Sequence, residues 1–125
     1  MLRIAVCEDE PHLLEQLSGQ VRAFCSAQNL AAQVAAYPSG ERLLLAGMDS
    51  DIALLDIGLG GLSGVETARR MRAKGFAGVL VFVTSHRDYA LDAFALGAVH
   101  YLVKPVEPQG LAEALVRALQ RLGHR

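Results

Sequence analysis

The chain has 125 residues, of which 52% are hydrophobic and 20% charged, and this balance predicts one folded domain with a substantial core. A net charge of −1 gives no reason to expect direct binding to nucleic acid or to an anionic membrane. The apolar runs are too short to cross a bilayer, and the N-terminus lacks the layout of a signal peptide, so we expect a cytoplasmic protein. Cys7 and Cys25 have no metal-binding spacing and are expected to be buried and reduced.

Residues 2–7 form an almost wholly apolar run, which predicts a buried strand. The acidic segment Glu8-Asp9-Glu10 follows, and Pro11 suits the first turn of a helix that is expected to end near Asn29. Apolar residues recur in this helix at helical spacing, namely Leu13, Leu14, Leu17, Val21 and Phe24. The first unit of the chain is therefore a strand, an acidic turn and an amphipathic helix.

Residues 32–37 predict a less apolar strand at an edge of the sheet, and Ser39 can cap a short helix after it. That helix carries Leu43, Leu44 and Leu45. Residues 51–56 then place four consecutive apolar residues before Asp56, as in a strand that is buried on both faces. Glycines follow at positions 58, 60, 61 and 64. The Asp56 carboxylate is thus expected at the end of a buried strand, in front of a pliable loop.

Ser63 and Glu66 have the spacing of a capping box, in which each side chain bonds to the backbone at the other residue. The helix that follows has an apolar stripe of Val65, Ala68 and Met71. Its exposed side is expected to carry the basic residues Arg69, Arg70, Arg72 and Lys74. Residues 79–83 are wholly apolar and predict a fourth strand, which ends at Thr84-Ser85.

A fourth helix is expected to be capped by Ser85 with Asp88 and to stop at Gly97. Residues 98–103 predict a fifth strand before Lys104-Pro105, and the last helix begins near Pro108. That helix is expected to bury Leu111, Leu115, Ala118 or Leu119, and Leu122. Strand and helix thus alternate five times, which predicts an α/β fold: one doubly wound, five-stranded parallel sheet with the flavodoxin-like strand order 2-1-3-4-5.

In such a sheet the carboxyl ends of the strands meet at one edge, and four of these ends carry polar side chains. They are Glu8-Asp9, Asp56, Thr84 and Lys104. Oxygen ligands without Cys or His favour Mg²⁺ over Zn²⁺ as the cation that offsets crowded carboxylates. A phosphoryl group on a carboxylate oxygen would be compensated by the metal and Lys104, with one hydrogen bond from Thr84.

Over essentially its whole length, the chain resembles a response-regulator receiver domain of the CheY-like kind. The resemblance rests on four motifs: Glu8-Asp9, Leu-Leu-Asp-Ile around Asp56 with Gly64 eight residues on, Val-Thr-Ser around Thr84, and Tyr-Leu-Val-Lys-Pro at 101–105. It implies that residues 1–125 are one receiver domain without an output domain. It also implies that Asp56 accepts a phosphoryl group from a sensor histidine kinase, and that the chain is not itself an enzyme beyond self-phosphorylation from small donors and autodephosphorylation.

The same resemblance assigns roles to the other residues. Asp9 would bind Mg²⁺ directly, Glu8 largely through water, and the backbone carbonyl of Gly58 would join Asp56 as a further ligand. Thr84 and Lys104 would contact the phosphoryl group, and the Lys104-Pro105 peptide would be cis. Thr84 and Tyr101 would move together as a switch that reshapes the face made by the fourth helix, fifth strand and fifth helix, which could also form a homodimer.

One position departs from the family pattern, because Gly60 stands where proline is common, which gives a more mobile loop. With the segment 85–94, the Gly60-Gly61 pair resembles the receivers of LytTR-type transcription regulators. The chain is then either a receiver cut from such a regulator, whose DNA contacts belong to the missing output domain, or a free-standing receiver. His86 and Gly58 flank the site, where they could influence the phosphoryl lifetime.

Three other functions share parts of this pattern. A flavodoxin-like cofactor binder would need a phosphate-binding loop rich in Gly, Ser or Thr where this chain has Glu8-Asp9-Glu10. A metal-dependent phosphohydrolase needs a placed acid or base, and no second carboxylate follows Asp56 at close spacing. An unphosphorylated pseudo-receiver that serves only as a docking module would be expected to have lost one of the acids, Thr84 or Lys104, and none is lost.

Overall fold

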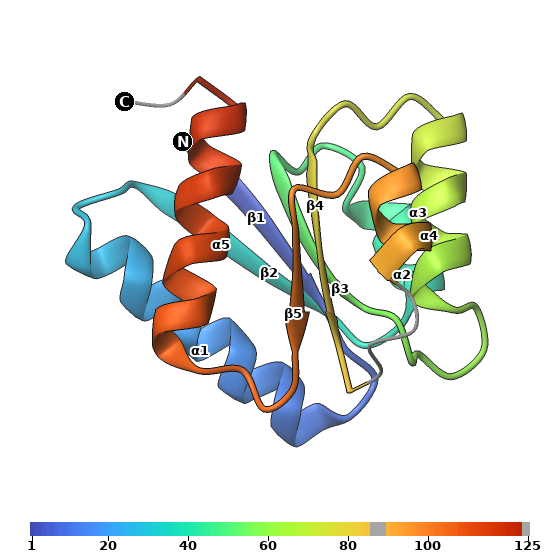
Figure 1. Cartoon of the computed structure of the whole chain (residues 1–125), viewed down its shortest axis with the longest axis horizontal. Coiled ribbons are helices and arrows are strands. Elements are labelled where there is room, and N and C mark those ends of the chain that lie inside the picture. Colours follow the sequence, from blue (N-terminus) through green and yellow to red (C-terminus); the bar gives the residue numbers. More distant parts are fainter. Residues whose placement is uncertain (86–89, 124–125) are drawn as a thin grey trace.

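The structure, a computed structural model, describes residues 1–85 and 90–123 (Figure 1). The strands are β1 Leu2–Cys7, β2 Ala32–Tyr37, β3 Ile52–Asp56, β4 Val79–Thr84 and β5 His100–Val103. The helices are α1 Pro11–Ala27, α2 Gly40–Ala46, α3 Gly64–Ala73, α4 Ala90–Ala95 and α5 Pro108–Arg121. The predicted cap at Asp88 and the position of His86 lie outside the described residues.

The five strands pair in the order β2-β1-β3-β4-β5, and every pairing is parallel, as predicted. Helices α1 and α5 cover one face of the sheet, while α2, α3 and α4 cover the other (Figure 1). Successive side chains of a strand point to opposite faces, so Ile4 and Val6 pack in the first layer while Ala5 and Cys7 pack in the second. Strands β3 and β4 are buried along their whole length, because helices cover both of their faces.

Local chemistry accounts for the ends of several helices. Glu10 caps α1, because its carboxylate accepts hydrogen bonds from the backbone N–H groups of His12 and Leu13. Asn29, just after α1, has a φ of 55°, and Gly97, after α4, has a φ of 79°; both are left-handed conformations that end a helix. Glu8 and Asp9 are therefore not needed as caps, and their carboxylates are available for other partners.

Three apolar residues of the predicted helices are exposed, and two of them, Leu13 and Leu122, belong to stripes that the sequence pattern placed against the core. Leu13 is 37% exposed, Leu45 is 84% exposed, and Leu122 is 37% exposed. Leu45 lies on a helix of only two turns, in which Leu43 alone of the three leucines is fully buried. Leu122 comes after the last residue of α5, so the prediction extended the helical stripe one position too far.

Three further details correct the predicted elements. Strand β3 begins at Ile52, one residue later than predicted, and β5 begins only at His100, because the Ala98 N–H still bonds to the Ala93 carbonyl in the turn after α4. Ser63 caps α3 as expected, but the Glu66 carboxylate pairs with Arg69 and Arg70 on the helix surface rather than with the cap. Among the described residues, no helix is both long and apolar enough to cross a membrane.

Candidate functional site

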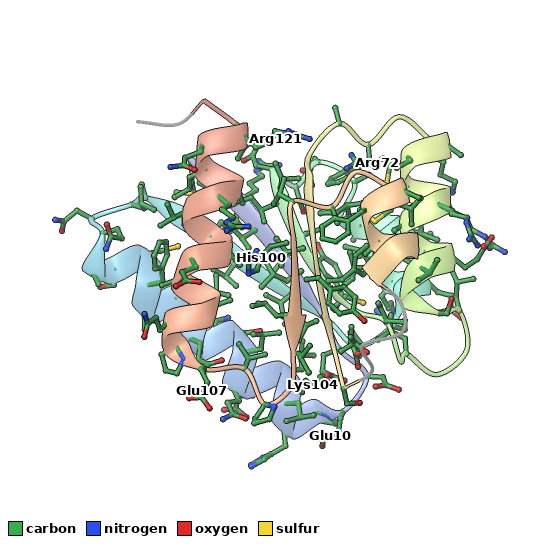
Figure 2. All side chains as sticks on the ribbon, in the orientation of Figure 1. Glu10, Arg72, His100, Lys104, Glu107 and Arg121 are labelled. Carbon is green, nitrogen blue, oxygen red and sulfur yellow. The ribbon has the colours of Figure 1, made fainter. Side chains whose placement is uncertain are left out.

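The polar residues predicted at the strand ends come together at the carboxyl edge of the sheet. Lys104 follows β5 at this edge (Figure 2). Its side chain contacts Glu8, which follows β1, and Asp56, the last residue of β3. Its ammonium Nζ lies 2.5 Å from Glu8 Oε1 and 3.1 Å from Asp56 Oδ2. The Lys104-Pro105 peptide just beyond the strand is cis, as predicted. One cation therefore bridges two carboxylates from different strands.

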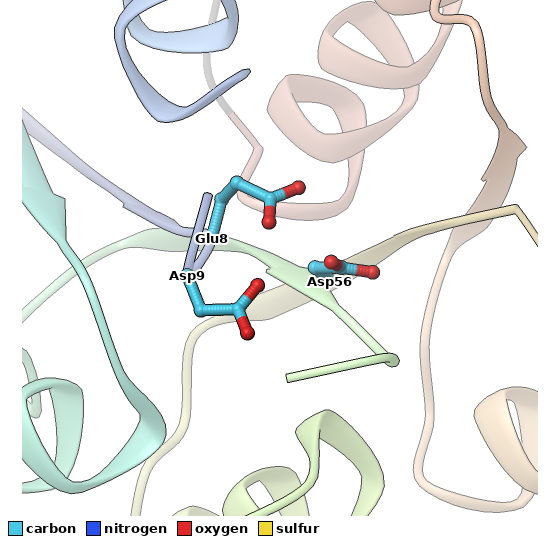
Figure 3. A group of neighbouring side chains, drawn as sticks. All are labelled: Glu8, Asp9 and Asp56. Carbon is cyan, nitrogen blue, oxygen red and sulfur yellow. The ribbon is translucent and has the colours of Figure 1, made fainter. Parts of the chain in front are cut away.

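A third carboxylate, that of Asp9, completes an acidic cluster. One ligand oxygen each of Glu8, Asp9 and Asp56 lies within 4.8 Å of the others, and the three side chains point toward a common space (Figure 3). Glu8 is only 2% exposed and Asp56 only 6%, whereas Asp9 is exposed. Two of the charges are thus removed from bulk water, and the third faces it.

Backbone N–H groups hold each of these carboxylates. The Glu10 N–H donates to Glu8 Oε2 at 3.1 Å, and the Gly58 N–H donates to Asp56 Oδ1 at 3.1 Å. The Gly60 N–H donates to Asp9 Oδ2 at 2.9 Å. Two of the three donors thus belong to the loop between β3 and α3. A carboxylate has two oxygens with several acceptor sites, so these bonds leave capacity for a cation.

Gly64, which the sequence marked only by its spacing from Asp56, has a steric role at this site. A Cβ atom at position 64 would lie 2.1 Å from the Asp56 backbone carbonyl oxygen, which is far inside van der Waals contact. The first residue of α3 therefore packs directly on the end of β3, and only glycine permits this approach. The close contact fixes where the β3–α3 loop must return.

Burial and hydrogen bonds shift the pKa values of several groups in and beside the cluster. Burial raises the pKa of the Glu8 carboxyl, and the hydrogen bond from Lys104 offsets this only in part. Burial by itself would lower the pKa of Lys104, but its hydrogen bonds to Glu8 and Asp56 and the charges of these acids outweigh it, and the pKa is raised. Burial and the neighbouring carboxylates raise the pKa of the Cys7 thiol to about 12, so this cysteine stays a protonated, inert core residue.

The two predicted switch residues lie on β4 and β5. Thr84 is fully buried at the end of β4, next to Val83, which is the register partner of Asp56. The Lys104 N–H donates to the Thr84 carbonyl at 2.7 Å, so the backbone ties these two site residues together. Tyr101 is half-buried against the layer formed with α2, α3 and α4, and it pairs with Phe82 across the sheet.

The donor set fits a magnesium ion. Carboxylate oxygens are the ligands that a hard divalent cation prefers, and at this edge one ammonium faces three carboxylates. Such an excess of like charge is unfavourable unless a cation or a proton offsets it. The residues therefore suit an ion that is shared between protein oxygens, water and a phosphate group.

A cavity of about 330 Å³ adjoins the cluster, and sequence reasoning did not find it. It lies between α1 and the segment that follows β5, and its lining includes Leu13, Leu17, Glu8, Lys104 and Val106. The exposed Leu13, which broke the expected core pattern, is part of this wall. The signal in the sequence was Leu13 itself, an apolar residue in the first turn of α1.

Comparison with known proteins agrees with this geometry. The pattern of the response regulator receiver domain family matches residues 4–116. The chain is 35% identical over 122 residues to the positive alginate biosynthesis regulatory protein of Pseudomonas aeruginosa, covering 94% of this chain and 47% of that protein. It is 31% identical over 128 residues to the sensory transduction protein LytR of Staphylococcus saprophyticus, covering 98% of this chain and 47% of that protein. The expected similarity to receivers of LytTR-type regulators is thereby confirmed.

Solved structures extend the comparison to the whole fold. The response regulator TrrA of Thermotoga maritima, crystallised in complex with Mg²⁺ and BeF, is 28% identical with a TM-score of 0.80, covering 95% of this chain and all of that one. The response regulatory domain of mrkE from Klebsiella pneumoniae has a TM-score of 0.84 at 22% identity over 98% of both chains, which shows the shared fold. The chain spans about half the length of the curated relatives named above. The chain therefore belongs to the response regulator receiver domain family, the phosphate-accepting domains of two-component signal transduction.

Proposed function

We propose that Asp56 is the phosphoacceptor of this receiver and that Mg²⁺ is held by Asp9, Asp56 and the backbone carbonyl of Gly58, with Glu8 acting through water. The observation that carries the proposal is the cluster itself: three carboxylates with ligand oxygens within 4.8 Å of one another, beside an ammonium that contacts two of them. The relative TrrA, crystallised with Mg²⁺ and BeF, supports the choice of metal.

The contacts of the three acids favour Asp56 as the nucleophile. Both Glu8 and Asp56 have two engaged oxygens, but Glu8 is the more buried of the two at 2% exposed, and its contact with Lys104 is shorter, 2.5 Å against 3.1 Å for Asp56. Asp9 is exposed and lies on the solvent side of the cluster. Asp56 stands at the end of β3 and has Lys104 beside one oxygen, where the ammonium can stabilise charge that develops on a transferred phosphoryl group.

In the proposed reaction, an Asp56 carboxylate oxygen attacks phosphorus in line with the leaving group. A P–O bond forms while the P–N bond to a phosphohistidine of a sensor histidine kinase breaks, and the released imidazole nitrogen takes up a proton from water. Bound Mg²⁺ would neutralise charge on the phosphoryl oxygens. Lys104 would pair with one of these oxygens, and the Thr84 hydroxyl would donate to another.

The output of the reaction is proposed to be a change on the face made by α4, β5 and α5. Thr84 moving toward the phosphoryl group would leave room for Tyr101 to turn inward, which is a shift between two populations. Phe94 of α4 is 55% exposed and Val116 of α5 is 43% exposed, so each of the two helices has an apolar side chain that a second copy of the chain could cover. The similarity to LytR supports a receiver that controls a DNA-binding output domain.

The deciding experiment is incubation with acetyl phosphate or phosphoramidate and Mg²⁺, followed by intact-mass measurement. The wild-type protein is expected to gain the mass of one phosphoryl group, and the gain is expected to disappear in Asp56→Asn and when the metal is chelated. Asp49→Asn is the matched control, because Asp49 is an exposed acid that pairs with Arg3 outside the cluster and should leave the gain unchanged. No gain in the wild type, or an undiminished gain in Asp56→Asn, would disprove the assignment.

A further inference from the structure

Asp9 differs from the other two acids of the cluster in how it is held. It is exposed to solvent, yet its Oδ2 atom accepts a hydrogen bond of 2.9 Å from the Gly60 N–H, which lies 51 residues away in the chain. Asp56 is held in a similar way by Gly58, two residues earlier in the same loop. A single loop therefore supplies N–H donors to two of the three carboxylates.

The close approach of the loop to Asp9 depends on the residue type at position 60. Proline, which is common at this position in the family, has no N–H and could not make the bond. A Cβ atom at position 60 would lie 3.2 Å from Asp9 Oδ2, so the glycine backbone comes nearly as close to the carboxylate as the chain can. The next residue, Gly61, has a φ of 69°, and its Cβ position would lie 3.1 Å from Glu41 Oε2. The loop thus runs close to two carboxylates, and a methyl group at position 60 would require Asp9 to move by only a few tenths of an ångström.

The bond to Gly60 leaves Asp9 able to bind a cation. The Gly60 N–H occupies Oδ2, and the second oxygen of the carboxylate keeps its acceptor sites. Because the N–H fixes one oxygen, the orientation of the other is restricted before any ion arrives.

We propose that the Gly60 N–H is a positioning group for magnesium: it orients Asp9 as a ligand and ties the β3–α3 loop to the metal site. This inference rests on the proposed function, in which Asp9 is a metal ligand. Binding of the ion then changes the loop directly, through Asp9 at Gly60 and through Asp56 at Gly58, without phosphorylation. The glycine at position 60 thus gives this receiver a link between metal and loop that a proline at this position would lack.

The test compares Gly60→Pro with Gly60→Ala in Mg²⁺ titrations followed by amide NMR, because the chain has no tryptophan to report binding by fluorescence. Both substitutions restrict the loop, but only proline removes the N–H. Gly60→Pro is expected to bind Mg²⁺ about three- to tenfold more weakly than the wild type, while Gly60→Ala stays within about twofold. In the wild type, the Gly60 amide signal is expected to shift during the titration.

A second measurement needs neither metal nor the proline variant. In the metal-free wild type, the Gly60 amide is expected to exchange its hydrogen about tenfold more slowly than in Asp9→Ala, because the carboxylate protects it. The inference would be overturned by equal exchange in these two proteins. It would also be overturned if all three proteins of the titration bound Mg²⁺ equally well, or if proline and alanine weakened binding equally. If the wild type itself binds no Mg²⁺, the proposed function fails first, and this outcome is distinct from the others.

Discussion

A partly buried cation lies at each end of the sheet, Arg72 at the amino ends of the strands and Lys104 at their carboxyl ends, but the two cations have different kinds of partner. At the amino ends of β4 and β5, the Arg72 guanidinium donates to three backbone carbonyls, those of Leu96 at 3.2 Å, Phe76 at 3.0 Å and Gly78 at 2.8 Å. It also lies 5.3 Å from the centre of the Phe76 ring. At the carboxyl ends, Lys104 contacts the two carboxylates of Glu8 and Asp56, and Asp9 is close by. Figure 2 shows Arg72 and Lys104 at opposite ends of the molecule.

The difference lies in the charge of the partners. Arg72 joins α3 to the turns before β4 and β5, and its partners are neutral carbonyls that a loop would otherwise leave without a bond. Burial lowers the pKa of Arg72, with a further contribution from Arg121, and the cation serves the fold. Lys104 faces more negative charge than it can neutralise. A partly buried polar group is therefore no sign of function by itself, whereas charge left without compensation is.

The largest expected effect on stability comes from Arg72, at the amino ends of β4 and β5. Arg72→Met is expected to lower the free energy of unfolding by about 2–3 kcal/mol, because the three carbonyls lose their donor in a half-buried site. Urea denaturation followed by circular dichroism measures this. Arg69→Met is the control on the same helix, since Arg69 is exposed and pairs only with Glu66 in the surface contacts of α3, and it should change stability by about 0.5 kcal/mol or less. Equal losses in the two variants would contradict the comparison.

Removing a charge at the carboxyl ends of the strands is expected to have the opposite effect on stability. Without metal, Asp56→Asn should raise the free energy of unfolding by about 1 kcal/mol, because it removes one of three crowded carboxylates and leaves an amide oxygen to accept a hydrogen bond. Added Mg²⁺ should reverse the order, since the wild type would gain about 2.7 kcal/mol at a metal concentration one hundred times its Kd. Thermal unfolding with and without Mg²⁺ tests both halves. A variant that is less stable than the wild type under metal-free conditions would show that this edge is built for stability.

The smallest effect concerns His100, at the start of β5. Burial lowers the pKa of His100 below its ordinary value of 6.5, and Arg117, whose Nη1 lies 3.3 Å from His100 Nδ1, adds to the shift. As the pH falls, the His100 imidazole is protonated in the unfolded chain at a higher pH than in the native protein. The native protein should therefore lose stability as the pH falls from 6.5 toward the lowered pKa. The slope of unfolding free energy against pH in this window should be shallower in His100→Gln. An unchanged slope would mean that protonated His100 is tolerated beside Arg117 in the folded protein.

The sequence by itself determined the elements and the members of the site. Apolar runs of strand length, separated by amphipathic helices, were enough to predict a parallel sheet in the order 2-1-3-4-5. The topology then required Glu8, Asp56 and Lys104 to meet, because the carboxyl ends of parallel strands share one edge. These inferences succeed since they depend on local periodicity and on a general rule of chain connection.

Only the tertiary structure decided which side chains find distant partners. Helical periodicity placed Arg72 among exposed basic residues, but its long side chain turns to the carbonyl of Leu96, 24 residues away, and to those of Phe76 and Gly78 in the turn after α3. The bond between Asp9 and Gly60 links residues 51 positions apart through a backbone N–H. Such a bond cannot be predicted from residue type, because every residue except proline has this donor. Periodicity tells which face of an element is apolar. It does not tell which atoms of another segment will lie within hydrogen-bond distance, because this depends on how the packed layers bring the loops together.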